Sequence, residues 1–276
     1  MANAPKTSTA KKEKSNSSSN IFASLAIIIC FAIGALVYVY VMGDPSNFID
    51  ENPENQPKPG NYYGMVYKAG VVIPVLLGLF LMVFVFSIER YIVISRASGT
   101  GNVGNFVRKI QSLIGVGNLD SAIAECDKQK GSVANVIKSG LLKYKDVSVN
   151  PNLDTEQSVL AIQKEIEEAT ALEMPMLEKN LTVIATLVSI GTLTGLLGTV
   201  TGMIRAFSAL ATGGAPDSAA LANGISEALI CTATGIATST FAIVFYNIFT
   251  SKIDNLTYSI DEAGFSIIQT YAATHK

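Results

Sequence analysis

Residues 181–211 are LTVIATLVSIGTLTGLLGTVTGMIRAFSALA, and residues 218–250 are SAALANGISEALICTATGIATSTFAIVFYNIFT. Arg205 and Glu227 are the only charged residues in these two runs. At 1.5 Å per residue, an α-helix of either length crosses a hydrocarbon core of about 30 Å. The segment between the runs, residues 212–217, contains two glycines and a proline, which are typical of a turn. We therefore predict two membrane-spanning helices joined as a hairpin.

Two further apolar runs lie upstream of the hairpin, at residues 21–42 and 70–88. The first run carries no formal charge and is too long for a secretory signal sequence, and Gly43-Asp44-Pro45 after it offers no small-x-small cleavage site. We expect it to be a retained membrane anchor. The predicted fold class is therefore all-α: a polytopic membrane protein with four transmembrane helices and a helical cytoplasmic domain.

The composition supports a membrane protein and excludes several other classes. Of the 276 residues, 49% are hydrophobic and only 15% are charged, whereas about 25% are charged in an ordinary soluble domain. A net charge of -2 without a basic patch makes nucleic-acid binding unlikely. Cys30, Cys126 and Cys231 form no CxxC pair, and His275 is the only histidine. The sequence therefore predicts no disulfide framework, no metal site, no cofactor and no enzymatic activity.

The distribution of basic residues predicts the orientation, because lysine and arginine near a span tend to stay on the cytoplasmic side. Lysines precede the first run, acidic residues predominate between the first two runs, and arginines follow the second. Both termini are then expected in the cytoplasm. The expected segments are a disordered cytoplasmic tail at 1–20, a span at 21–42, an acidic and proline-rich periplasmic loop at 43–69, a span at 70–88, a cytoplasmic helical domain at 89–180, a span at 181–211, a periplasmic turn at 212–217, a span at 218–250 and a cytoplasmic tail at 251–276.

The segment 89–180 shows apolar residues at helical spacing and no strand alternation. Asp154 with Gln157 three residues later predicts a capping box that opens a charged helix. Pro175 is expected to break or kink that helix shortly before the third span begins.

Small and hydroxylated residues recur every three or four positions in both helices of the hairpin. They are Thr182, Thr186, Ser189, Thr192, Gly195, Thr199 and Gly202 in the first helix, and Gly224, Thr232, Thr234, Gly235, Thr238 and Ser239 in the second. One interpretation is a helix-packing seam, to which Gly195, Gly198, Gly202, Gly224 and Gly235 would contribute. The other is a polar, water-accessible pathway lined by hydroxyl groups.

Counting outward from the turn places Thr199 level with Thr232, and Arg205 level with Glu227. At 100° per residue, Glu227 points about 140° away from Thr232, so the two levels use different faces of the helix. Arg205 and Glu227 can therefore form an intramembrane ion pair, within the hairpin or between subunits. Alternatively, Arg205 extends to the outer interface and has no partner. Because a charge near the bilayer centre costs about 3 kcal/mol, both residues are candidates for a functional site.

The blocks GLLGTVTG at residues 195–202 and GISEALICTATG at residues 224–235 resemble the MotA/TolQ/ExbB proton-channel family, most closely its ExbB and TolQ branch. The resemblance extends to SIER at residues 87–90. It implies that Thr199 and Thr232 are pore-lining hydroxyls and that Glu227 is an intramembrane carboxylate of the proton pathway. Arg205 matches no family motif, and the first span with its acidic loop is an addition to the three-span pattern of the family.

The resemblance also implies partners and a location. The chain is expected to form a homo-oligomer, a pentamer by analogy with the family, around an ExbD-like single-span subunit with an intramembrane aspartate. In the bacterial inner membrane, this complex would use the proton-motive force to drive a TonB-like protein that energises outer-membrane transport. TolQ-like envelope maintenance and a non-conducting membrane scaffold are alternatives. The GISEAL block disfavours a flagellar MotA-type stator.

Overall fold

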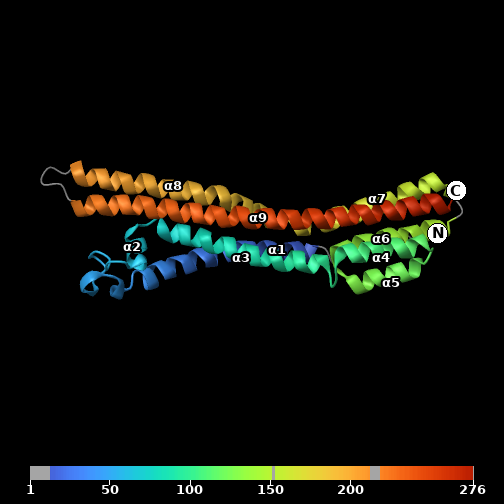
Figure 1. The fold of residues 1–276 in the computed structure, drawn as a ribbon, viewed down its shortest axis with the longest axis horizontal. Helices are drawn as coiled ribbons and strands as arrows, with labels where there is room; N and C mark the ends of the chain where they lie inside the picture. The colour runs from blue at the N-terminus through green and yellow to red at the C-terminus, as the bar shows by residue number, and fades with distance from the viewer. Residues whose placement is uncertain (1–12, 151–152, 212–217, 276) are drawn as a thin grey trace, which may run out of the picture. The chain divides into compact units, whose positions relative to one another are not determined.

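The computed structural model describes residues 13–150, 153–211 and 218–275 (Figure 1). Within these ranges the chain is helical, and its β-structure is limited to one isolated bridge between Phe48 and Pro57. In chain order the helices are α1 (Glu13–Leu36), the π-helix η1 (Val37–Met42), the 3-10 helices η2 (Pro45–Asn47) and η3 (Ile49–Glu51), α2 (Tyr62–Lys68), α3 (Ile73–Ser98), α4 (Val103–Gly115), α5 (Leu119–Gln129), α6 (Gly131–Ser148), α7 (Thr155–Glu178), α8 (Leu181–Ala211) and α9 (Ser218–Thr274).

Four helical segments are long and apolar enough to cross a membrane: Ala23–Met42, Ile73–Gly115, Thr155–Ala211 and Ser218–Thr274. The predicted all-α class with four candidate spans is therefore confirmed. The chain divides into two compact units. The first comprises Met1–Ser87 and Val183–Val244, and the second comprises Ile88–Thr182 and Phe245–Lys276.

In the first unit, close contacts join the additional N-terminal helix to α3. A Cβ atom added to Gly34 would lie 2.8 Å from the backbone nitrogen of Gly78, and one added to Gly78 would overlap the ring of Phe31. The backbones of α1 and α3 therefore approach each other directly. Small residues permit such an approach between membrane helices.

Aromatic packing joins α3 to α9 within the same unit. The ring of Phe241 lies 5.9 Å from that of Phe80 and 5.6 Å from that of Phe84. These contacts help to place α3 against the hairpin helices that carry the candidate site.

The second unit contains α4 to α7 with parts of α3 and α9. Asn102 and Asn118 cap α4 and α5 with their side chains, and the capping box predicted at Asp154 and Gln157 is confirmed at the start of α7. Cys126 is buried in this unit, and burial raises the pKa of its thiol to about 12. Its thiol therefore remains protonated at physiological pH.

The junction between α7 and α8 lies a few residues beyond Pro175. Helix α7 continues through this proline to Glu178, and Asn180 adopts a positive φ of 48° before α8 begins. Arg90, which is only 2% exposed, donates from Nη1 to the carbonyl oxygens of Met176 at 3.3 Å and Leu177 at 3.1 Å. The arginine thus satisfies carbonyl groups that the end of α7 leaves without helical partners.

Two segments expected to be tails are helical where the structure describes them. Helix α1 begins at Glu13, and α9 continues to Thr274. The extension of α9 buries an apolar stripe with spacings of three and four residues: Ile253, Leu256, Ile260, Ala263, Ile267 and Tyr271. The remainder of the N-terminal tail, residues 1–12, and the turn expected at 212–217 lie outside the described residues.

Candidate functional site

Helices α8 and α9 lie side by side in the first unit, with glycines at their contact (Figure 1). A Cβ atom added to Gly202 would lie 2.7 Å from the backbone nitrogen of Ala228, and one added to Gly235 would lie 2.7 Å from the carbonyl oxygen of Gly191. Gly195 and Gly224 face the opposite backbone in the same way, and Gly198 faces the side chain of Cys231. All five glycines named from the sequence therefore lie where the two helices touch.

Hydroxyl groups bridge the same two helices at two levels. The hydroxyls of Thr199 and Thr232 contact each other, and Thr192 and Ser239 form a second pair at 2.8 Å. The Thr199 hydroxyl also lies 3.2 Å from the carbonyl oxygen of Gly195. Because a hydroxyl both donates and accepts, each bridge can reverse its direction without bearing a charge.

Thr199 also lines a shallow groove on the surface of α8. The other residues of the groove are mostly apolar: Val200, Met203, Ile204, Phe207, Ser208 and Ala211. Its volume is about 600 Å³. The Thr199–Thr232 contact thus lies at one end of a mostly apolar groove.

Arg205 and Glu227 form an ion pair within the hairpin of a single chain. The Nη1 atom of Arg205 lies 3.0 Å from Oε1 and 2.9 Å from Oε2 of Glu227. The side chain of Glu227 is only 3% exposed, whereas that of Arg205 is 52% exposed. Burial of an ionised carboxylate is unfavourable unless a cation and hydrogen bonds accompany it, so the arginine is the group that stabilises the charge of Glu227.

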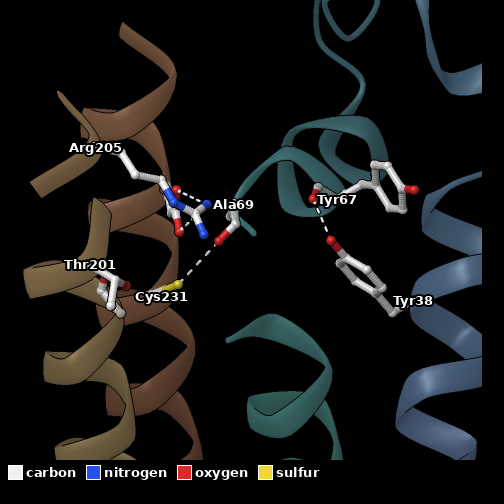
Figure 2. Close-up of polar contacts among 8 residues, drawn as sticks. Tyr38, Tyr67, Ala69, Thr201, Arg205 and Cys231 are labelled. Carbon is white, nitrogen blue, oxygen red and sulfur yellow. Dashed lines mark hydrogen bonds and ion pairs between the residues drawn. The ribbon is translucent and has the colours of Figure 1, made fainter. Parts of the chain in front are cut away.

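The chain that leads into α3 lies against this ion pair (Figure 2). The carbonyl oxygen of Ala69 accepts a hydrogen bond from Sγ of Cys231 at 3.5 Å. A Cβ atom added to the next residue, Gly70, would lie 2.5 Å from Oε1 of Glu227. The sequence does not predict either of these neighbours of the site. Nothing in the local sequence around Ala69 and Gly70 indicates a contact with residues so far along the chain.

Among the described residues, no group of three or more histidine, cysteine, aspartate or glutamate side chains is placed to bind a metal ion. The titratable pair of the site is Arg205 and Glu227, on a different part of the hairpin from the threonine contact. The arrangement can stabilise a buried charge at one place and offer neutral hydrogen-bonding groups at another.

Residues 128–262 match the model of a protein family described as the MotA/TolQ/ExbB proton channel family. The matched segment includes α8, α9 as far as residue 262, and all the site residues named from the sequence. It does not include Ala69 or Gly70.

Relatives with related names support the same comparison. The chain is 36% identical to an ExbB-like biopolymer transport protein of Synechocystis sp. over 88 residues, which are 31% of this chain and 42% of the relative. It is 31% identical to the Tol-Pal system protein TolQ of Pseudomonas aeruginosa over 124 residues, 45% of this chain and 54% of the relative. With the biopolymer transport protein ExbB of Neisseria meningitidis, identity is 26% over 210 residues, 71% of this chain and 91% of the relative. The first two matches therefore span about half or less of each relative's own length.

Proposed function

We propose that this chain, whose residues 128–262 match the MotA/TolQ/ExbB proton channel family, is a stator subunit that oligomerises around the membrane helix of a partner and admits protons. The partner would be an ExbD-like protein with one span and one intramembrane aspartate. Proton entry would then drive a TonB-like protein that energises transport across the outer membrane.

The observation that carries this proposal is the Thr199–Thr232 contact beside the apolar groove of α8. A partner helix can pack its apolar side chains against Val200, Met203 and Ile204. An aspartate on that helix can then exchange hydrogen bonds with the threonine hydroxyls as it gains and loses a proton. The hydroxyls would serve both protonation states because they donate to a carboxylate and accept from a carboxylic acid.

The partner aspartate is needed because the described spans provide few titratable groups of their own. Glu227 is paired with Arg205 and buried, and the threonine hydroxyls do not ionise at physiological pH. One proton that crosses a membrane potential of 100 mV releases about 2.3 kcal/mol. Several protons would therefore be required for each sizeable conformational step.

We place the complex in a bacterial inner membrane, with both termini in the cytoplasm, the segment 89–180 as a cytoplasmic domain and the segment 43–69 in the periplasm. The names of the relatives and the candidate spans support an inner-membrane location, and the distribution of lysine and arginine supports the orientation. A pentamer is the oligomer that the family resemblance suggests.

Substitution of the hydroxyls tests the proton pathway. Thr199→Val and Thr232→Val keep the side-chain volume nearly constant and remove the hydroxyl groups. We expect proton flux through the purified complex in liposomes, measured with a pH-sensitive dye, to fall at least severalfold while the yield of assembled complex is unchanged. The control is Thr240→Val, because the exposed Thr240 hydroxyl bonds to the carbonyl oxygen of Ile236 in its own helix.

A scaffold whose small residues serve packing alone predicts a different result. In that case Thr199→Val and Thr232→Val would leave flux at the level of Thr240→Val. Equal flux in all three variants would therefore reject the proton pathway and favour the scaffold.

A role of the TolQ type is the second candidate, because the relative from Pseudomonas aeruginosa carries that name at 31% identity. Native mass spectrometry of the complex, gently purified from its own membranes, separates the two roles. An ExbD-like partner that recruits a TonB-like protein supports the transport role. A TolR-like partner with a TolA-like protein supports envelope maintenance, and the absence of any single-span partner contradicts both.

A further inference from the structure

The segment Val37 to Gly70 links the additional N-terminal span to α3 and lies outside the residues that match the family model. We call this segment the strap. It contains η1, η2, η3 and α2, and its last residues lie against the Arg205–Glu227 pair. Neither the family match nor the proposed function gives the strap a role.

Aromatic contacts hold the two ends of the strap together. The ring of Tyr38 stacks on that of Tyr67 at a centroid distance of 4.8 Å, and the Tyr38 hydroxyl donates to the carbonyl oxygen of Tyr67 at 2.9 Å (Figure 2). Phe48 is fully buried, with its ring 5.5 Å from that of Tyr67. The π-helix η1, at the start of the strap, and the short helix α2, near its end, are therefore fixed to each other.

Polar contacts fix the middle of the strap. The side-chain amide of Asn47 donates to the carbonyl oxygens of Val41 and Met42 at 2.9 and 3.1 Å. Its oxygen accepts a hydrogen bond from Asn61 at 2.9 Å. The strap is thus a small folded element and not an open loop.

The strap ends on the hairpin. Ala69 is fully buried, belongs to one apolar cluster with Val72, Ile73, Leu76 and Cys231, and accepts the hydrogen bond from Cys231. This cluster anchors the end of the strap to α9, four residues beyond Glu227.

Gly70 brings the backbone next to the ion pair. Its φ is +86°, a conformation that favours glycine. A Cβ atom at this position would lie 2.5 Å from Oε1 of Glu227 and 2.9 Å from Nη1 of Arg205. Any larger residue would therefore displace the carboxylate, the guanidinium or the strap itself.

The lysine of the strap is engaged elsewhere. Lys68 donates to the carbonyl oxygen of Glu54 at 2.9 Å, and its Nζ atom lies 5.7 Å from the centre of the Phe48 ring. Both partners belong to the strap. Among the described residues, Arg205 is thus the cation that pairs with Glu227.

We propose that Gly70 is a positioning residue for the Arg205–Glu227 pair. The strap covers the Glu227 carboxylate and holds it in its ion pair with Arg205. The additional span would then serve as the anchor of this cover. The effect on proton flux rests on the proposed function, whereas the cover itself is a property of the chain that can be tested without conduction.

The test compares Gly70→Ala with Gly60→Ala in the complete complex in native membranes. Gly60 also lies in the strap with a positive φ of +81°, but an added Cβ atom would meet nothing within 4 Å. The two variants therefore introduce similar backbone strain, and only the first collides with the ion pair. The readout is the rate at which dicyclohexylcarbodiimide, an apolar reagent for protonated carboxyl groups, modifies Glu227, followed by mass spectrometry.

We expect Gly70→Ala to raise the labelling rate of Glu227 severalfold toward that of Arg205→Gln, in which the carboxylate has lost its cation. Gly60→Ala should label at the wild-type rate. If Arg205→Gln labels rapidly but Gly70→Ala labels no faster than Gly60→Ala, the proposal is overturned.

A second pair of variants covers the case in which Gly70→Ala does not fold. Tyr38→Phe keeps the aromatic stacking and removes the hydrogen bond to Tyr67, so it loosens the strap without adding an atom next to the ion pair. Tyr40→Phe, at a residue that is 72% exposed, is its control. Faster labelling of Glu227 in Tyr38→Phe than in Tyr40→Phe supports the strap, and equal rates contradict it.

Proton flux through the same complexes separates this proposal from the proposed function. Faster labelling with altered flux in Gly70→Ala supports both. Faster labelling with unchanged flux supports the strap and removes Glu227 from the conduction pathway.

Discussion

The two charged residues of the hairpin differ in their surroundings, and this difference decides how each substitution acts. Glu227 is almost fully buried, whereas about half of the Arg205 side chain is exposed. A cation with access to the surface can find other partners when its carboxylate is removed. A buried carboxylate that loses its cation must take up a proton or remain unpaired.

We therefore predict that Arg205→Gln destabilises the protein more than Glu227→Gln. The expected cost is about 1–3 kcal/mol for Arg205→Gln, reduced from that of a fully buried pair by the exposure of the arginine, and less than about 1 kcal/mol for Glu227→Gln. Thermal denaturation in detergent, with the yield of assembled complex, measures both effects.

The control for this comparison is Lys145→Gln. Lys145 lies 2.7 Å from Asp120 in an ion pair that is exposed on both sides, so its loss should cost at most about 0.5 kcal/mol. A larger loss of stability in Glu227→Gln than in Arg205→Gln would contradict the predicted order.

At the scale of single residues, the sequence indicated the depth of the site but not its surroundings. Regular helix geometry and the position of the turn predict that Arg205 and Glu227 lie level, and these quantities are local. The contact of Gly70 with Glu227 depends on how α3 packs against the hairpin, which no local pattern encodes. For the same reason, the hydrogen bonds from Arg90 to the end of α7 were not predicted.

At the scale of helices, the close contact between α8 and α9 depends on glycines, which have no side-chain atoms to separate the two backbones. A Cβ atom at Gly202 or Gly235 would meet the backbone of the facing helix at 2.7 Å. Backbone atoms cannot move aside as the end of a flexible side chain can, so the helices themselves would have to separate.

We predict that Gly202→Ala lowers stability by about 1–3 kcal/mol through overpacking, although alanine is the better helix former by up to about 1 kcal/mol. The matched control is Gly115→Ala at the end of α4, where an added Cβ atom would meet nothing within 4 Å. This control should be neutral or slightly stabilising in thermal denaturation. Equal stability of the two variants would mean that the helices separate at no cost.

The sequence predicts the bounds of a helix well where the helix is apolar on all sides. It predicts them less well where a helix continues beyond its apolar run. The expected span 181–211 has the same bounds as α8. By contrast, α9 continues far beyond residue 250, because a stripe of buried residues replaces the continuous apolar run. A stripe of buried residues changes the mean hydropathy little, so the sequence signal for this part of α9 is the 3.6-residue period of the stripe.

At the scale of the whole molecule, the charged residues of the apolar runs 21–42, 70–88, 181–211 and 218–250 are Arg205 and Glu227, which form one ion pair. Hydroxyl groups can donate and accept hydrogen bonds, but they do not become charged by gaining or losing a proton at physiological pH. The protein should therefore require a partner with a titratable group in its membrane helix.

We predict that the chain reconstituted alone in liposomes conducts no more protons than empty liposomes, and that flux appears when the partner is added. A pH-sensitive dye trapped inside the liposomes measures this after a potassium diffusion potential is imposed. The complex purified from native membranes is the positive control. Flux through the chain alone that equals the flux of the complex would show that the pathway lies within this chain.

The π-helical turn at Val37–Met42 affects the direction in which the chain leaves the additional span, as well as the length of that span. In this turn the backbone N–H of Gly43 bonds to the carbonyl oxygen of Tyr38, five residues earlier, at 3.0 Å. Each residue of an α-helix turns the chain by about 100°, so inserting or deleting one residue here would swing the following segment around the helix axis. Homologous chains that keep the cover over Glu227 should therefore keep this irregular turn, and chains that lose it should change the length of the loop in compensation.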